Sequence, residues 1–218
     1  MLVATRSLGK LRELLPLFAA EGVEVETLDD AGLAASVEED TLEAYETFEA
    51  NALAKARWFH AQSGGRLVVA DDSGLMVDAL GGAPGVRSKR WSNRADLDGV
   101  ALDHANNAHL QSMLTRAEAV GQSDRSARYV CAAAAVWSGG ECVVRGTTEG
   151  AITRVASGDG GFGYDPYFVS DVLGLSFAMA TRDAKSAISH RGRAFAALVA
   201  MLRDRGVLHS SGGMTGDG

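Results

Sequence analysis

Residues 68–90 constrain the fold and the chemistry of this chain more than any other stretch. Residues 68–70 are an apolar run of the kind that fills a buried strand, and two carboxylates, Asp71 and Asp72, follow where that strand is expected to end. Glycine-containing turns are expected next, at residues 73–74 and 81–85. Three cations close the stretch: Arg87, Lys89 and Arg90. Acidic groups at a strand end, glycine-rich backbone and nearby cations indicate a divalent metal that handles a phosphate-bearing ligand.

The composition is that of a soluble globular protein. A chain of 218 residues forms one large domain or two small lobes and can bury a proper core. The net charge of −7 argues against a nucleic-acid surface, because phosphate backbones demand excess Lys and Arg, but it is compatible with a small anionic ligand. Cys131 and Cys142 lack the spacing of a zinc site or a disulfide framework. No run approaches the ~20 apolar residues of a membrane span and no signal peptide opens the chain, so we expect a cytoplasmic protein without a membrane partner.

The first part of the chain alternates strands and helices. A strand is expected at residues 2–5, followed by a polar loop that ends at Gly9 and Lys10 and by a helix over residues 11–20. This order directs backbone N–H groups at an anion, although an ordinary strand–helix corner with an exposed lysine is the simpler interpretation of the loop alone.

A second strand at residues 23–27 precedes an acidic loop, and a long helix is predicted over residues 41–62. Asn51 and Lys55 share a face of that helix, for which a solvated surface is the simplest interpretation.

The second part of the chain combines a helix with a hairpin. A helix is predicted over residues 95–118, and strands at residues 127–137 and 141–148 are joined by a turn. The small residues 132–135 imply close packing against a helix or another subunit. Together these elements predict a mixed sheet flanked by helices.

Two further segments carry unusual residues. The glycine-rich loop at residues 158–166 contains Phe162 and Tyr164, whose rings either stack on a nucleobase or fill the core. Ser189 is a candidate N-cap that places His190 and Arg191 in a first helical turn, where cations oppose the helix dipole, and such a local conflict favours a functional role. Residues 209–218 are predicted to be a disordered tail after a single domain over residues 1–208.

Five segments, in this order, resemble the inosine triphosphate pyrophosphatase family, the noncanonical purine nucleoside triphosphate pyrophosphatases. The segments are residues 4–10 (ATRSLGK), 47–56 (TFEANALAKA), 70–75 (ADDSGL) with 81–85 (GGAPG), 161–166 (GFGYDP) and 185–192 (KSAISHRG). The resemblance implies an α/β fold with a long twisted mixed β-sheet flanked by helices and two lobes around a central cleft, usually in a homodimer. It also implies Mg²⁺-dependent hydrolysis of inosine, deoxyinosine and xanthosine triphosphates to the monophosphate and pyrophosphate.

The resemblance also implies roles for single residues. Asp72 matches the catalytic and metal-binding position, with Asp71 as its supporting neighbour, and Glu43 stands at the register of the other metal carboxylate. Glu39 and Glu46 are the alternatives to Glu43 within the acidic segment. The residues that match substrate contacts are Thr5, Arg6, Ser7, Leu8, Gly9, Lys10, Lys55, Ser73, Phe162, Gly163, Tyr164, Asp165, Lys185, His190 and Arg191. Ser7 departs from the pattern, because the family usually has Asn there.

The expected chemistry follows from these residues. Mg²⁺ and lysines, with Lys89 or Arg90, neutralise a triphosphate, and Asp72 deprotonates a water that attacks the α-phosphorus. Donors on His190 and Arg191 suit the 6-carbonyl of hypoxanthine and xanthine and disfavour the amino group of adenine. Two alternatives stay open: a pyrophosphatase for other modified nucleotides, and a nucleotide-binding sensor without catalysis.

Overall fold

The computed structural model describes residues 1–208, apart from the side chain of Asp40. The elements are β1 (Leu2–Val3), α1 (Leu8–Ala20), β2 (Glu26–Thr27), the 3₁₀ helix η1 (Val37–Thr41), α2 (Phe48–Gln62), β3 (Val68–Val77), the 3₁₀ helices η2 (Asp78–Leu80) and η3 (Gly85–Arg90), α3 (Gly99–Ala119), β4 (Ser126–Trp137), β5 (Gly140–Ile152), β6 (Phe168–Ser170), α4 (Arg182–Ile188) and α5 (His190–Asp204). The predicted tail, residues 209–218, lies outside the described residues.

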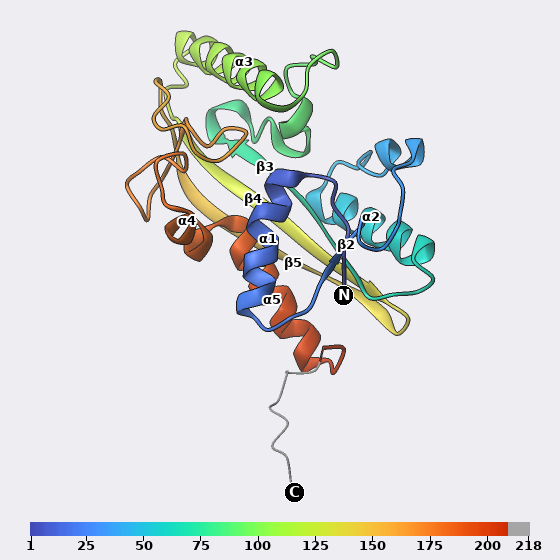
Figure 1. Ribbon diagram of the computed structural model, residues 1–218. Helices are drawn as coiled ribbons and strands as arrows, with labels where there is room; N and C mark the ends of the chain where they lie inside the picture. The colour runs from blue at the N-terminus through green and yellow to red at the C-terminus, as the bar shows by residue number, and fades with distance from the viewer. Residues whose placement is uncertain (209–218) are drawn as a thin grey trace, which may run out of the picture.

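A six-stranded mixed sheet organises the chain, in the order β2-β1-β3-β4-β5-β6. β1 pairs in parallel with β2 and β3, and the pairs from β3 to β6 are antiparallel. The three long strands β3, β4 and β5 run diagonally through the whole molecule (Figure 1). This arrangement confirms the predicted α/β class with a long mixed sheet.

Helices cover both faces of the sheet along its lower half. Side chains alternate between faces along a strand, so Ala132 and Ala134 pack with α2 in one core while Ala133 and Ala135 pack with α5 in another. The alanine run therefore packs against helices, which decides between the two alternatives for residues 132–135. At Gly146 of β5 an added Cβ would lie 2.3 Å from the His190 carbonyl oxygen, so only glycine lets the start of α5 approach the sheet this closely.

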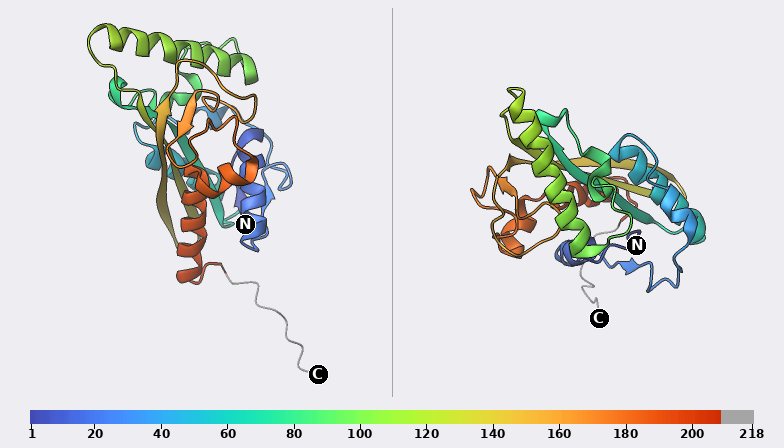
Figure 2. Two further views of the ribbon diagram at one scale, coloured as in Figure 1. Left: turned by 90° about the vertical axis from the view of Figure 1, so that its left-hand side faces the viewer. Right: turned by 90° about the horizontal axis from the view of Figure 1, so that it is seen from above.

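A second lobe covers the upper ends of the long strands. α3 lies across this end of the molecule, with η2, η3 and the loops around β6 beneath it (Figures 1 and 2). Its core contains Leu75 of β3, Leu110 and Leu114 of α3, and Phe168 of β6. The two lobes share β3 and β4, so residues in the middle of β3 lie where the lobes meet.

The predicted end of the first long strand is wrong. β3 continues through Asp71, Asp72 and the expected turn at residues 73–74 as far as Val77, paired with β4 throughout. A strand interior tolerates these polar residues because each carboxylate finds partners on its own face of the sheet, as described below.

The predicted helix over residues 41–62 is also wrong at its start. α2 begins at Phe48, because the side chain of Thr47 accepts a hydrogen bond from the backbone N–H of Ala50 and caps the helix there. Residues 37–41 form a separate 3₁₀ helix, in which Ser36 and Glu39 make a reciprocal capping box. Residues 42–47 therefore form a loop, from which Glu43 can reach the interface of the two lobes.

The remaining boundaries shift by a few residues. Ser7 caps α1, which begins at Leu8 rather than at residue 11, and the second strand contains only Glu26–Thr27. α3 begins at Gly99, four residues later than predicted. The β4–β5 hairpin and the N-cap at Ser189 are confirmed. Within the described residues, no helix combines the length and the apolarity that crossing a membrane requires.

Candidate active site

The two aspartates of β3 lie at the centre of the site and point to opposite faces of the sheet. Asp71 faces α1 and α5, where Lys10 Nζ lies 3.0 Å from its Oδ2 and Arg191 Nε lies 3.3 Å from the same oxygen. Asp72 faces α2, where Asn51 Nδ2 donates to its Oδ2 at 2.8 Å. Successive side chains of a strand point to opposite faces of the sheet, so the two adjacent aspartates lie in different environments.

The two environments give the carboxyl groups different protonation behaviour. Burial raises the pKa of Asp71, but the charges of Lys10 and Arg191 outweigh burial and hold that pKa well below its ordinary value. Burial also raises the pKa of Asp72, and Lys55 and Lys10 do not fully offset it, because the carboxylate of Glu43 adds a like charge. Asp71 therefore stays ionised to a lower pH than an ordinary aspartate, while Asp72 binds a proton more readily than one.

Acid is expected to destabilise the protein through Asp71. Its folded pKa is depressed, so its stabilising contribution is present above the ordinary pKa of 3.8 and is lost as the pH falls below that value. Urea unfolding measured from pH 7 to pH 3 checks this. We expect Asp71→Asn to have a lower free energy of unfolding than the wild type at pH 7, and this free energy should fall less steeply than that of the wild type below pH 4. If the free energies of the two proteins fell in parallel, the depressed pKa of Asp71 would be contradicted.

Glu43 is the second carboxylate at the cavity. Lys55 Nζ lies 2.6 Å from its Oε1, and the guanidinium of Arg90 donates to its backbone oxygen at 2.8 Å. Burial raises the pKa of Glu43, but the charges of Lys55 and Lys10 outweigh it and lower that pKa, so Glu43 is ionised. A solvated surface was the simplest expectation for Asn51 and Lys55, but Asn51 is buried and Lys55 is mostly covered, and both contact acidic residues.

The structure separates Glu43 from its two alternatives. Glu39 is held by Arg6 at 2.9 Å and by the capping box with Ser36, and Glu46 has an exposed side chain outside the cavity lining. Glu43 lines the cavity, and its charge is one of the influences on the pKa of Asp72. No group of three or more His, Cys, Asp or Glu ligands exists among the described residues. Two carboxylates fit Mg²⁺, which is bound through one or two carboxylates plus substrate phosphates and water.

The loop between β1 and α1 brings only part of its predicted contacts to the cavity. Ser7, Gly9 and Lys10 line it. The side chain of Arg6 is turned away and bound to Asp29, Glu39 and the Leu33 oxygen; Thr5 and Leu8 lie outside the lining. The hydroxyl of Ser7 accepts the backbone N–H of Lys10, so it serves as the helix cap.

The two aromatic residues of the glycine-rich loop lie in different environments, so one fits stacking on a nucleobase and the other fills the core. Phe162 is 38% exposed and its ring lies against Gly9, where an added Cβ would approach it to 3.1 Å. Tyr164 is buried in the core and donates its hydroxyl to the Ser88 oxygen at 2.8 Å. Phe162 is therefore the ring presented to the cavity, and Tyr164 fills the core.

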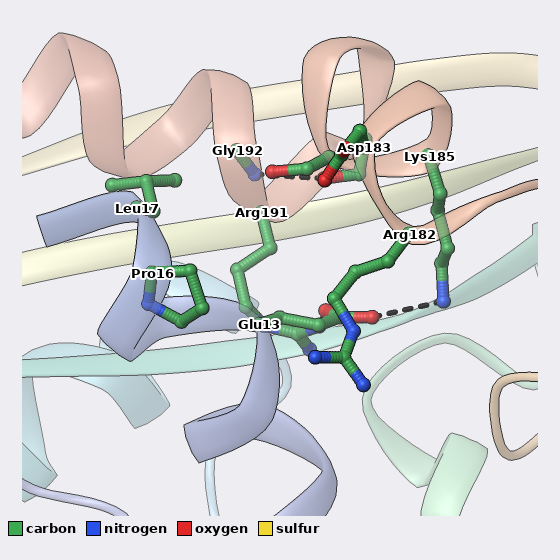
Figure 3. A pocket seen from close by; sticks show the side chains of 10 residues that line it. Glu13, Pro16, Leu17, Arg182, Asp183, Lys185, Arg191 and Gly192 are labelled. Carbon is green, nitrogen blue, oxygen red and sulfur yellow. Dashed lines mark hydrogen bonds and ion pairs between the residues drawn. The ribbon is translucent and has the colours of Figure 1, made fainter. Parts of the chain in front are cut away.

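A row of alternating charges connects the two ends of the cavity. Its members, in order, are Lys10, Asp71, Arg191, Glu13, Lys185 and Asp165. Glu13, which the sequence did not single out, joins Arg191 to Lys185, with its Oε1 2.8 Å from Lys185 Nζ (Figure 3). It stands one helical turn after Lys10 on α1, and this spacing is the signal that could have revealed it. A smaller hollow of about 70 Å³ borders Glu13 between α1, α4 and the start of α5 (Figure 3).

Arg191 and His190 have different roles in this row. All three nitrogens of the Arg191 guanidinium are bound, to Asp71, to Glu13 and, at 2.7 Å, to the Ser73 hydroxyl. His190 is buried, and its ring stacks on Tyr129 with centroids 4.7 Å apart. Burial and then the charge of Arg191 hold the pKa of His190 well below its ordinary value, so the imidazole is neutral at pH 7.

These groups surround one cavity of about 320 Å³ between the lobes. The predicted residues that line it are Ser7, Gly9, Lys10, Glu43, Ser73, Phe162, Gly163, Tyr164, Asp165, Lys185, His190 and Arg191. Lys55 and Asp72 lie outside this lining: Lys55 contacts it through Glu43, and Asp72 contacts it through the N–H of Ser73, which donates to Asp72 Oδ1 at 3.0 Å. The fold and the site thus define a two-lobed α/β protein whose cleft is lined by carboxylates, lysines and an aromatic ring.

Known proteins place this architecture in a family. The model of the Ham1 family matches residues 1–201, and the chain belongs to that family. A dITP/XTP pyrophosphatase of Frankia alni is 44% identical over 207 residues, which cover 94% of this chain and 97% of the relative.

Solved structures agree with this assignment. A HAM1 protein from Coxiella burnetii has a TM-score of 0.78 at 30% identity, covering 93% of this chain and 98% of its own. A nucleoside-triphosphatase, dITP/XTP pyrophosphatase, from Mycobacterium abscessus has a TM-score of 0.66 at 42% identity, covering 91% and 97%. The resemblance inferred from the five segments is confirmed.

Proposed function

We propose that the protein hydrolyses noncanonical purine nucleoside triphosphates (ITP, dITP and XTP) to the monophosphate and pyrophosphate with Mg²⁺, and so cleanses the nucleotide pool. The observation that carries the proposal is the division of the acidic pair between the two faces of the sheet: Lys10 and Arg191 bind Asp71, while Asn51 orients Asp72 beside Ser73, which lines the cavity. The names of the relatives support the substrate class. The family resemblance adds a homodimer in the cytoplasm to the proposal.

Glu43 and Asp72 are the residues that would hold Mg²⁺. Burial first, and then the like charge of Glu43, raise the pKa of Asp72, and a divalent cation held by both residues would relieve that repulsion. When bound, the ion supplies charge neutralisation for the triphosphate and polarises a phosphoryl oxygen.

Asp72 is the proposed general base. It accepts a proton from a water whose oxygen attacks the α-phosphorus; the bond from that phosphorus to the bridging oxygen breaks, and pyrophosphate leaves. Asn51 donates to Asp72 Oδ2 at 2.8 Å and also binds the backbone of Tyr45 at both its N–H and its oxygen. This amide therefore fixes the orientation of the carboxylate.

The base end of the cavity favours a carbonyl acceptor. Lys185 Nζ has three N–H groups, of which Asp165 and Glu13 take two, so a third is left for an acceptor in the cavity. The amino group at the 6 position of adenine would face this donor without a partner. Such a mismatch costs about 1–3 kcal/mol, or tenfold to hundredfold discrimination. The ring of Phe162 offers a flat face for stacking.

Pyrophosphate release from a panel of triphosphates, with Mg²⁺ and with a chelator, tests the proposal. We expect release from ITP, dITP and XTP well above that from ATP, and only with the metal. Release from modified pyrimidine triphosphates instead would favour the first alternative, a pyrophosphatase for other modified nucleotides. Binding without release would favour a nucleotide sensor.

Replacing Lys89 is expected to weaken phosphate binding. Lys89 lines the cavity with an exposed side chain, and no carboxylate among the described side chains pairs with it, unlike Lys10, Lys185 and Arg191. An unpaired cation gives a triphosphate a charge-assisted contact worth about 1.5–3 kcal/mol. We therefore expect Lys89→Ala to raise the inhibition constant of pyrophosphate about tenfold or more. Arg87→Ala, an exposed neighbour outside the cavity lining, is the control, and equal effects of both changes would indicate only general charge steering.

A further inference from the structure

One face of α3 carries polar side chains that point into the protein. Asp103, Asn106 and Asn107 are spaced to share this face, and both asparagines are buried. Buried polar groups in proteins are satisfied by specific partners, so their partners show what they do.

Asp103 and Asn107 hold both backbone polar groups of Gly163. The Gly163 N–H donates to Asp103 Oδ2 at 2.8 Å, and Asn107 Nδ2 donates to the Gly163 oxygen at 2.8 Å. Asn107 also donates to the backbone oxygen of Asp103 at 2.9 Å, which ties the two side chains together. Gly163 has φ of +63°, a left-handed conformation that a free loop does not keep in one geometry without such contacts.

The hydrogen bonds to Gly163 also fix the backbone of its neighbour, Phe162. The N–H of Phe162 donates to Asp165 Oδ2 at 2.9 Å, so the backbone is anchored on both sides of the Phe162 side chain. The ring itself is exposed to the cavity. Through its hydrogen bonds to Gly163, α3 therefore determines where the Phe162 ring lies in the cavity.

Asn106 makes the same kind of contact with another wall of the cavity. Its Oδ1 accepts the N–H of Ser92 at 2.9 Å, and its Nδ2 donates to the Lys89 oxygen at 3.0 Å. Two adjacent asparagines thus hold two different segments, one carrying the aromatic ring and the other carrying the unpaired lysine.

We propose that Asp103 and Asn107 are positioning residues for nucleobase recognition, which act by holding Gly163 so that the Phe162 ring covers the base. The inference rests on the proposed function and adds to it two residues on a helix that does not belong to the five family segments. Asn106 has the separate role of holding the Lys89 segment, which serves the phosphate end.

The test compares a ligand with a base and a ligand without one. For Asn107→Ala and Asp103→Ala we expect the KM for ITP to rise about tenfold, the ITP over ATP preference in kcat/KM to fall, and kcat to change less than about threefold. The inhibition constant of pyrophosphate, which has no base, stays at the wild-type value. Asp103→Asn keeps an acceptor for the Gly163 N–H and restores the wild-type KM.

Asn106→Ala is the matched control, because it removes an adjacent buried asparagine with two contacts of the same kind. It raises the KM for ITP and the inhibition constant of pyrophosphate together and leaves the ITP over ATP preference unchanged. A parallel rise of both constants in Asn107→Ala and Asp103→Ala would overturn the inference, as would Asp103→Asn behaving like Asp103→Ala. Wild-type pyrophosphate release in the same assay separates these outcomes from a failure of the proposed function.

Discussion

Asp72→Asn is expected to lower kcat about 10²–10⁴-fold, the contribution of a positioned general base. The amide has nearly the same shape and still accepts the hydrogen bond from Asn51, but it cannot take a proton from water. Nucleotide binding depends mainly on the lysines, so the dissociation constant for ITP should change far less than kcat. Pyrophosphate release gives the turnover, and titration calorimetry gives the binding.

Asp71→Asn is the matched control for this change, because it alters the adjacent residue in the same way on the other face of the sheet. It should cost stability, since Lys10 and Arg191 lose their shared carboxylate, while the protein that stays folded keeps its general base. Near-normal turnover in Asp72→Asn would contradict the assignment of Asp72 as the general base. A larger loss of kcat in Asp71→Asn at full folding would exchange the roles of the two aspartates.

Local patterns predicted most elements of the fold. The hairpin turn and the N-cap at Ser189 each depend on residues close in sequence, and both are confirmed. The end of β3 was not predictable in this way. Whether a strand continues through two aspartates depends on Lys10, Asn51 and other residues far away in the chain that satisfy them.

The site shows the same division. The motifs singled out Lys10 and Phe162, which line the cavity, and Asp72, which adjoins the lining residue Ser73, because each stands in a segment with its own local signature. They did not distinguish a side chain that faces the cavity from one that faces away, so Arg6 was included although it binds Asp29 and Glu39. Asn51 and Glu13 were missed because their partners are 21 and 178 residues away in sequence. Such contacts are determined by how the helices pack on the sheet.

The structure also changes what replacing Arg191 should do. If Arg191 donates to the base, as the sequence predicts, Arg191→Ala should narrow the gap in turnover between inosine and adenosine triphosphates. In the structure each of its three nitrogens also donates to the protein, so the first effect should be on stability. Removing one partner of a buried ion pair costs about 3–5 kcal/mol. Lys10 still compensates Asp71, and Lys185 still compensates Glu13, so we expect a loss of about 3 kcal/mol, the low end of that range.

Thermal and urea unfolding of Arg191→Ala measure this loss of stability, which corresponds to a fall in Tm of about 6–12 °C. Arg193→Ala is the matched control, because it removes an exposed arginine of the same helix whose side chain, within residues 1–208, donates only to the Thr147 oxygen. The pH dependence adds an independent check. Arg191 helps to depress the pKa of Asp71, so the difference in stability between wild type and variant should shrink as the pH falls from 3.8 towards that depressed pKa, because the unfolded chain then binds a proton at Asp71 more readily than the folded wild type does. If the variant were as stable as the wild type and had a lower preference for ITP over ATP, the result would indicate instead that Arg191 recognises the base directly.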